Sequence, residues 1–195
     1  MNDFCIDLNI SIPFIEDEVY LNSLRSKYKR HNKIDPSTIN TKIIDFFKNK
    51  NLQITLAESF YRMPEDIAVP NIHKDAPGLT DATKINWVYG GGDSVMNWYQ
   101  PKVDNIQTNT SAIGITYEYY KRDDVELIHS QRVGFPSIVQ VGLPHDISNI
   151  TSDRLCISVF VKEISTTSFI TFEKAKKIFQ NEMASCTGIE PVSAT

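Results

Sequence analysis

The chain has 195 residues and a formal net charge of −4 at pH 7. Hydrophobic residues make up 41% and charged residues 23%, which is typical of a soluble globular protein with one substantial core. The negative balance offers no general basic surface, so nucleic acid is not an expected partner.

Cysteine usage and the chain start indicate the compartment. The three cysteines, Cys5, Cys156 and Cys186, are few, odd in number and without C-x-x-C spacing, which argues against a disulfide framework and a structural zinc site. The N-terminus carries acid where a signal peptide would carry base, and no apolar run has the length of a membrane span. We expect a cytoplasmic protein with no membrane partner.

The chain contains no internal repeat and no low-complexity linker, so it is predicted to form a single domain over residues 1–195. Residues 1–51 are expected to be an N-terminal helical region. Within it, the basic cluster at residues 25–30 is interpreted as the solvated face of a helix. Asp35 is predicted to cap a helix with Pro36 in its first turn, and the apolar stripe that follows predicts that this helix runs to about Lys50.

From residue 52 the pattern changes to short strands, which predict a jelly-roll core over about 52–163. The predicted strands are residues 52–62, 67–75, 84–89, 95–99, 111–120, 125–130, 137–142 and 155–161. The triglycine at 90–92 is interpreted as a hairpin loop, since no helix and no Gly-Lys-Ser/Thr follow it as a phosphate loop would require. A C-terminal helix and tail occupy about 170–195. The helix begins near Thr171, and residues 185–195 are expected to be a frayed tail.

His73 and Asp75 form the most informative motif of the chain. They lie two positions apart, so on an extended strand their side chains point to the same face. A second histidine, His145, follows a later apolar strand and is interpreted as its last residue. Two imidazoles and one carboxylate on one face of an iron leave its other positions open, which is the arrangement of non-haem Fe(II) oxygenases.

Arg154 completes the pattern nine residues after His145, where the next strand begins. A dicarboxylate co-substrate that chelates the same metal needs a cation at its far end. A guanidinium suits a carboxylate because it can form two parallel hydrogen bonds with it.

These residues, His73-x-Asp75, then His145, then Arg154, resemble the signature of the Fe(II)/2-oxoglutarate-dependent dioxygenases. The resemblance covers about residues 52–163, and the segment 83–99 is similar to the strand–loop–strand after H-x-D in small members, often from phage or bacteria. The resemblance implies a mainly β fold with flanking helices, in which a double-stranded β-helix (a cupin-like jelly roll) holds the metal.

The resemblance also implies a reaction. His73, Asp75 and His145 would hold Fe(II) as the catalytic centre, and Arg154 would bind the distal carboxylate of the co-substrate 2-oxoglutarate. With O2, and with ascorbate as reductant, such an enzyme forms succinate and carbon dioxide and hydroxylates a C–H bond of its substrate. Halogenating relatives replace the triad acid with a small residue, so Asp75 favours hydroxylation.

Family members often place a tyrosine that bonds the co-substrate on the strand before H-x-D, and Tyr61 stands there. Asn86, with the aromatic Trp98 and Tyr99, is a further candidate for the pocket lining. Ordinary core packing stays an equal alternative for each of them, since aromatic side chains dominate cores.

One departure concerns the serine beside the arginine. Members with an R-x-S motif use that serine on 2-oxoglutarate, whereas this chain has Cys156 there. Ser158, two positions further on the same face, is the candidate substitute.

Two other functions stay open. One is a cupin-like metal-binding or sensing protein without turnover, and the other is a jelly-roll isomerase or a dioxygenase without co-substrate. Arg154 favours the 2-oxoglutarate-dependent oxygenase over both alternatives, because neither alternative needs a cation at that position. The expected substrate is a small molecule, an amino acid or a peptide side chain, and the remaining histidines, His31 and His129, are given no site role.

Overall fold

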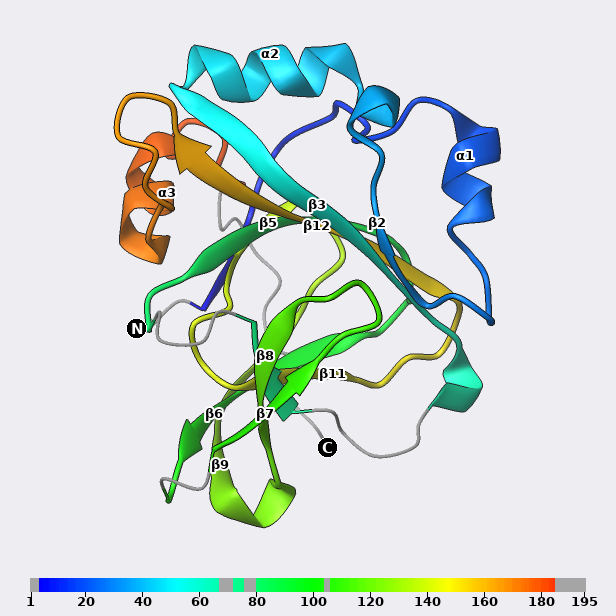
Figure 1. Ribbon diagram of the computed structural model, residues 1–195, viewed down its shortest axis with the longest axis vertical. Helices are drawn as coiled ribbons and strands as arrows, with labels where there is room; N and C mark the ends of the chain where they lie inside the picture. The colour runs from blue at the N-terminus through cyan, green and yellow to red at the C-terminus, as the bar shows by residue number, and fades with distance from the viewer. Residues whose placement is uncertain (1–3, 67–71, 76–79, 104–105, 185–195) are drawn as a thin grey trace, which may run out of the picture.

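The computed structural model describes residues 4–66, 72–75, 80–103 and 106–184, and these form two six-stranded antiparallel sheets (Figure 1). The first sheet has the order β1-β10-β5-β12-β3-β2, and the second has the order β7-β8-β4-β11-β6-β9. The expected mainly β composition with flanking helices is confirmed, and the two sheets are consistent with a β-sandwich. No helix of the described residues is long and apolar enough to cross a membrane.

The strands of the first sheet are β1 (Cys5–Asp7), β2 (His31–Lys33), β3 (Leu52–Arg62), β5 (Thr83–Gly90), β10 (Ser137–Gln140) and β12 (Arg154–Glu163). Those of the second sheet are β4 (Ile72–Lys74), β6 (Val95–Pro101), β7 (Gln107–Thr110), β8 (Thr116–Tyr120), β9 (Val125–Arg132) and β11 (His145–Ser148). The helices are α1 (Glu18–Ser23), α2 (Thr41–Asn49) and α3 (Phe172–Ile178), and short 3₁₀ turns occupy Pro36–Thr38, Pro64–Asp66 and Arg122–Asp124.

Helix α2 covers one face of the first sheet, above β3 in Figure 1. It buries Ile43 and Phe47, which lie four residues apart and therefore on one side of the helix. The predicted helix start at Asp35 is wrong: Asp35 caps the 3₁₀ turn, and the side chain of Asn40 accepts from the amide of Lys42 to begin α2. The C-terminal helix is confirmed as α3, with Thr171 as its cap.

The predicted helical region at 1–51 contains two strands as well as helices. β1 and β2 form the two edges of the first sheet. The basic cluster at 25–30 is not a helix face either, because α1 ends at Ser23 and the chain then runs through turns into β2. The predicted helical region was too long because edge strands of three residues are too short to show the two-residue alternation of a strand.

Strand prediction was best where the pattern was long. The predicted strand 52–62 coincides with β3, whereas β7 and β11 were not predicted. Of the predicted strand 67–75, residues 72–74 form β4, and 67–71 lie outside the described residues. The tail 185–195, with Cys186, lies outside them too. The predicted strand 111–120 narrows to β8, because residues 111–115 form a turn.

The predicted hairpin across the triglycine is wrong. β5 pairs with β10 and β12 in the first sheet, whereas β6 pairs with β9 and β11 in the second. The glycine loop therefore crosses from one sheet to the other. A tight turn between two strands fits both arrangements, so the local pattern could not separate them.

The first sheet is buried on both faces, and the two faces differ in chemistry. One set of alternating residues, including Leu155, Ile157 and Val159 of β12, belongs to the main hydrophobic core beneath the helices. The intervening positions carry polar groups that are nevertheless buried: Glu58, Lys84, Asn86, Arg154 and Ser158. Because strand side chains alternate between faces, these groups collect on the face opposite the helices.

Candidate metal centre

His73 and His145 are cross-strand neighbours in the second sheet. They are register partners of the antiparallel pair β4–β11, and their ring centroids lie 4.6 Å apart. Directly opposed residues of antiparallel strands share a face, so the pairing alone brings the two imidazoles together. The prediction that His145 ends the preceding strand is wrong. β10 stops at Gln140, the turn through Gly142 and Pro144 follows, and His145 begins β11.

Asp75 follows β4 and turns its carboxylate between the two histidines. Its Oδ1 lies 3.2 Å from Nε2 of His73, and its Oδ2 lies 3.8 Å from Nε2 of His145. One donor atom from each of the three residues lies within 4.8 Å of the other two. The three residues predicted as metal ligands are therefore brought together.

The donor set fits a divalent metal such as iron. Nδ1 of His145 lies 2.8 Å from the carbonyl oxygen of Leu143, so this nitrogen carries the proton and Nε2 has its lone pair free for a ligand bond. Burial, with the neighbouring His73, lowers the pKa of His145 to about 4. The imidazole is therefore neutral at pH 7, as a metal ligand must be.

Lys84 of β5 holds the other side of the Asp75 carboxylate. Its Nζ lies 3.0 Å from Oδ2 of Asp75 and 2.9 Å from Oε1 of Glu58. Burial opposes ionisation of Asp75, yet Lys84 and the two histidines hold its pKa well below the usual range. Asp75 is therefore a carboxylate at neutral pH, ready to offer an oxygen to a metal.

The polar network continues through Glu58 to His31, whose side chain is partly exposed. Nε2 of His31 lies 2.7 Å from Oε2 of Glu58, although His31 was predicted to have no site role. Lys84 and Glu58 were also missed. The signal that could have found them is the alternation of charged and apolar residues in β3 and β5, two strands that lie inside the first sheet with both faces covered.

Arg154 lies where β12 begins, with 3% of its surface exposed. Its Nε donates to the hydroxyl of Ser94 at 3.2 Å. Gly91 packs against its aliphatic stem, since a Cβ added to this glycine would meet side-chain atoms of Arg154 at 2.8–3.0 Å. The triglycine loop therefore has a specific role beyond flexibility, which is to leave room for the arginine.

Arg154 and the three candidate ligands line one small cavity of about 70 Å³ between the sheets. Asn86 and Ser158 also line it, and the hydroxyl of Ser158 donates to Oδ1 of Asn86 at 2.6 Å. Cys156 is a further wall residue, and both it and Cys5 are buried free thiols. Two of the three predicted supporting residues, Asn86 and Ser158, thus line the cavity that also contains the candidate ligands and Arg154.

Tyr61 is not brought to this small cavity. It points to the core side of β3, and its hydroxyl donates to Oδ2 of Asp153 at 2.6 Å. Trp98 is fully buried in a separate apolar cluster, and the hydroxyl of Tyr99 donates to Asp146. For Trp98 and Tyr99 the packing alternative describes their contacts, whereas Tyr61 also lines the larger cavity that adjoins the first.

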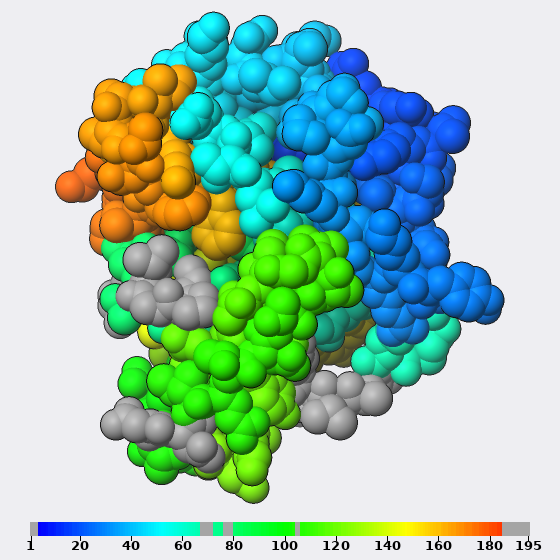
Figure 2. Space-filling model, in the orientation of Figure 1, coloured from blue at the N-terminus to red at the C-terminus, as the bar shows by residue number. Residues whose placement is uncertain are grey.

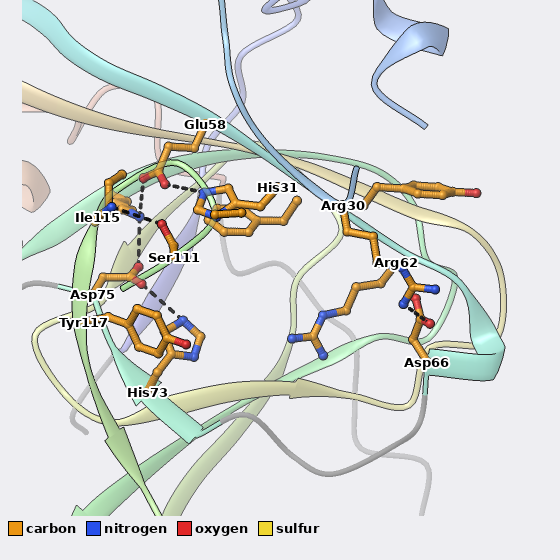
Figure 3. A pocket seen from close by; sticks show the side chains of 14 residues that line it. Arg30, His31, Glu58, Arg62, Asp66, His73, Asp75, Ser111, Ile115 and Tyr117 are labelled. Carbon is orange, nitrogen blue, oxygen red and sulfur yellow. Dashed lines mark hydrogen bonds and ion pairs between the residues drawn. The ribbon is translucent and has the colours of Figure 1, made fainter. Parts of the chain in front are cut away.

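A second, larger cavity of about 400 Å³ adjoins the first, since His73, Asp75, Phe60 and Arg62 line both. Its other walls come from β2 and from the β7–β8 hairpin, whose green side chains abut the blue N-terminal segment in Figure 2. Figure 3 shows the histidine and aspartate of the motif on one side of this cavity and the arginines Arg30 and Arg62 on the other. A cavity of this size suits a small molecule.

No model of a known protein family matches the chain, and a comparison with curated proteins gives no match either.

Proposed function

We propose that the protein is a non-haem Fe(II)/2-oxoglutarate-dependent oxygenase that hydroxylates a C–H bond of a small molecule or amino-acid side chain. The observation that carries the proposal is the convergence of His73, Asp75 and His145, with donor atoms within 4.8 Å of one another, on a cavity that also contains Arg154. A facial set of two imidazoles and one carboxylate is the ligand set of this class.

The strand order supports the finer fold, a jelly roll. Eight strands numbered along the chain as β3, β4, β5, β6, β9, β10, β11 and β12 divide into two four-stranded sets. Their orders are first-eighth-third-sixth and second-seventh-fourth-fifth. A double-sheet jelly roll winds its eight strands in this alternating way. The likeness to small phage and bacterial dioxygenases belongs to the same proposal.

Each residue would contribute a definite part. His73, Asp75 and His145 would hold Fe(II), which, when bound with 2-oxoglutarate and O2, supplies the oxidising chemistry. Arg154 would bind the distal carboxylate of 2-oxoglutarate, and the buried surroundings strengthen such a pair. Asn86 and Ser158 would donate to or accept from the same co-substrate. The larger cavity would hold the substrate beside His73 and Asp75 and shield it from water.

The first test is metal and co-substrate binding. Anaerobic protein with Fe(II) and 2-oxoglutarate should develop the weak visible absorbance of the chelate. His73→Ala and His145→Ala should each weaken iron binding by orders of magnitude, because each removes one ligand. Equal iron content in the wild type and both variants would rule out this site.

The second test separates an oxygenase from a cupin-like binding protein. With iron, ascorbate and 2-oxoglutarate, the wild type should release succinate slowly even without its substrate, and Asp75→Ala should release none. Circular dichroism of the metal-free variant serves as the folding control. A wild type that binds both ligands and never forms succinate would instead be a sensor.

A further inference from the structure

Arg62 is a cation in the wall of the larger cavity, and the carboxylates of Asp66 and Asp146 attract it only from beyond ion-pair distance. Among the described residues, no carboxylate forms an ion pair with its guanidinium, and no hydrogen bond from it is present. In Figure 3 its side chain extends across the cavity toward the side of His73, and no dashed line reaches it. Arg62 is partly buried, and a partly buried charge that makes no ion pair in a cavity wall is a candidate for binding a ligand.

The other basic side chains of the same wall already have partners. Arg30 forms an ion pair with Asp66, His31 bonds Glu58, and Lys84 bonds both Glu58 and Asp75. Arg62 thus differs from its neighbours in being available to a ligand. Apart from Ser111 and the candidate ligands, the remaining wall is apolar or aromatic, with Phe60, Tyr61, Ala112, Ile115 and Tyr117.

Position separates the role of Arg62 from that of Arg154. The two arginines are register partners on β3 and β12, so their side chains leave the same face of the sheet. Arg154 lines only the small cavity, together with Asn86 and Ser158, whereas Arg62 lines both cavities. Since Arg154 would neutralise the distal carboxylate of 2-oxoglutarate, Arg62 would remain for a second anion at the boundary.

We propose that Arg62 anchors a carboxylate of the substrate, so that the protein oxidises a small organic acid whose apolar part packs against Phe60 and Ile115. This inference rests on the proposed function, because the metal site identifies the larger cavity as the substrate cavity. A guanidinium can bind a carboxylate through two parallel hydrogen bonds, which fixes the orientation of the acid as well as its charge. The carbon chain would then extend toward His73 and Asp75.

Binding of straight-chain acids from butanoate to octanoate, each compared with its primary amide, tests the proposal directly. Calorimetry on metal-free protein and on the anaerobic Fe(II)/2-oxoglutarate complex should show at least one acid binding about tenfold or more tighter than its amide. Arg62→Met should abolish that preference. Lys33→Met, which removes an exposed positive charge from β2 outside this cavity, should retain it.

The variants also distinguish the two anion sites. Arg62→Met should leave the 2-oxoglutarate absorbance titration close to that of the wild type, whereas Arg154→Met should weaken it strongly. Equal losses of 2-oxoglutarate affinity would assign Arg62 to the co-substrate and overturn the inference. So would amides that bind as well as acids, a wild type that binds none of the acids, or inorganic phosphate that binds more tightly than every acid. Absence of the absorbance band in the wild type would instead count against the proposed function.

Discussion

At the scale of single residues, Lys84 determines the charge state of the centre. The residue is 2% exposed, and its ammonium lies within 3.0 Å of oxygens from both Asp75 and Glu58. Burial disfavours the charged form of Lys84, but the two carboxylates raise its pKa above the usual value. The lysine therefore stays charged and keeps two buried acids ionised without a metal.

Replacing this lysine should leave both carboxylates without their cationic partner. We expect Lys84→Met to lower the free energy of unfolding of the metal-free protein by about 3–5 kcal/mol, because it leaves buried carboxylates uncompensated. Urea denaturation at neutral pH measures this. The double variant Glu58→Gln/Lys84→Met should recover part of the loss, since only one carboxylate remains. A loss below about 1 kcal/mol would mean that the ion pairs of Lys84 contribute no more to stability than an exposed ion pair does.

At the scale of elements, the polar face of the first sheet explains which site residues the sequence revealed. His73 and Asp75 can be recognised from the H-x-D spacing, because two residues on one strand are enough to define that motif. His145 and Arg154 stand out only through their order after it. Lys84 and Arg62 were missed because each looks like an ordinary surface charge until its strand is known to be covered on both faces.

The glycine loop between β5 and β6 offers a test at this scale. Gly91 and Gly114 both have φ of +82°, so alanine at either position should cost about 1–2 kcal/mol of backbone strain. A Cβ at Gly91 would also meet the Arg154 side chain, whereas at Gly114 nothing lies within 4 Å. We expect Gly91→Ala alone to weaken 2-oxoglutarate binding, by about tenfold or more through displacement of Arg154.

The two variants are matched, so their comparison is informative in both directions. Equal 2-oxoglutarate affinity in Gly91→Ala and Gly114→Ala, measured by titration of the anaerobic absorbance, would show that Arg154 tolerates the added methyl or does not touch the co-substrate.

At the scale of the whole molecule, the site spans the two sheets. The candidate metal ligands come from β4, the residue after it and β11, whereas Lys84 and Arg154 come from the first sheet. The mainly β composition could be predicted from local patterns. The pairing could not, since β5 and β6 are adjacent in sequence yet belong to different sheets, and that depends on contacts between distant segments.

Fe(II) and 2-oxoglutarate, bound between the two sheets, should stabilise the fold in a fixed order, with iron first. Under anaerobic conditions, Fe(II) at a hundred times its Kd should raise the free energy of unfolding by about 2.7 kcal/mol. We expect 2-oxoglutarate to add a similar increment only when iron is present, since chelation requires the metal. Arg154→Ala should keep the iron increment and lose most of the second. An equal effect of 2-oxoglutarate on metal-free protein would contradict this coupling.

The adjacency of Arg62 and Arg154 has a practical consequence for handling the protein. Two guanidinium groups on neighbouring strands, neither of them in an ion pair with the described residues, attract multivalent oxyanions besides the proposed ligands. Sulfate, citrate and phosphate at ordinary buffer strength should therefore compete at these cavities and depress apparent activity. Substrate screens are best run in chloride salts with zwitterionic buffers, after exhaustive dialysis to remove acids carried over from the expression host.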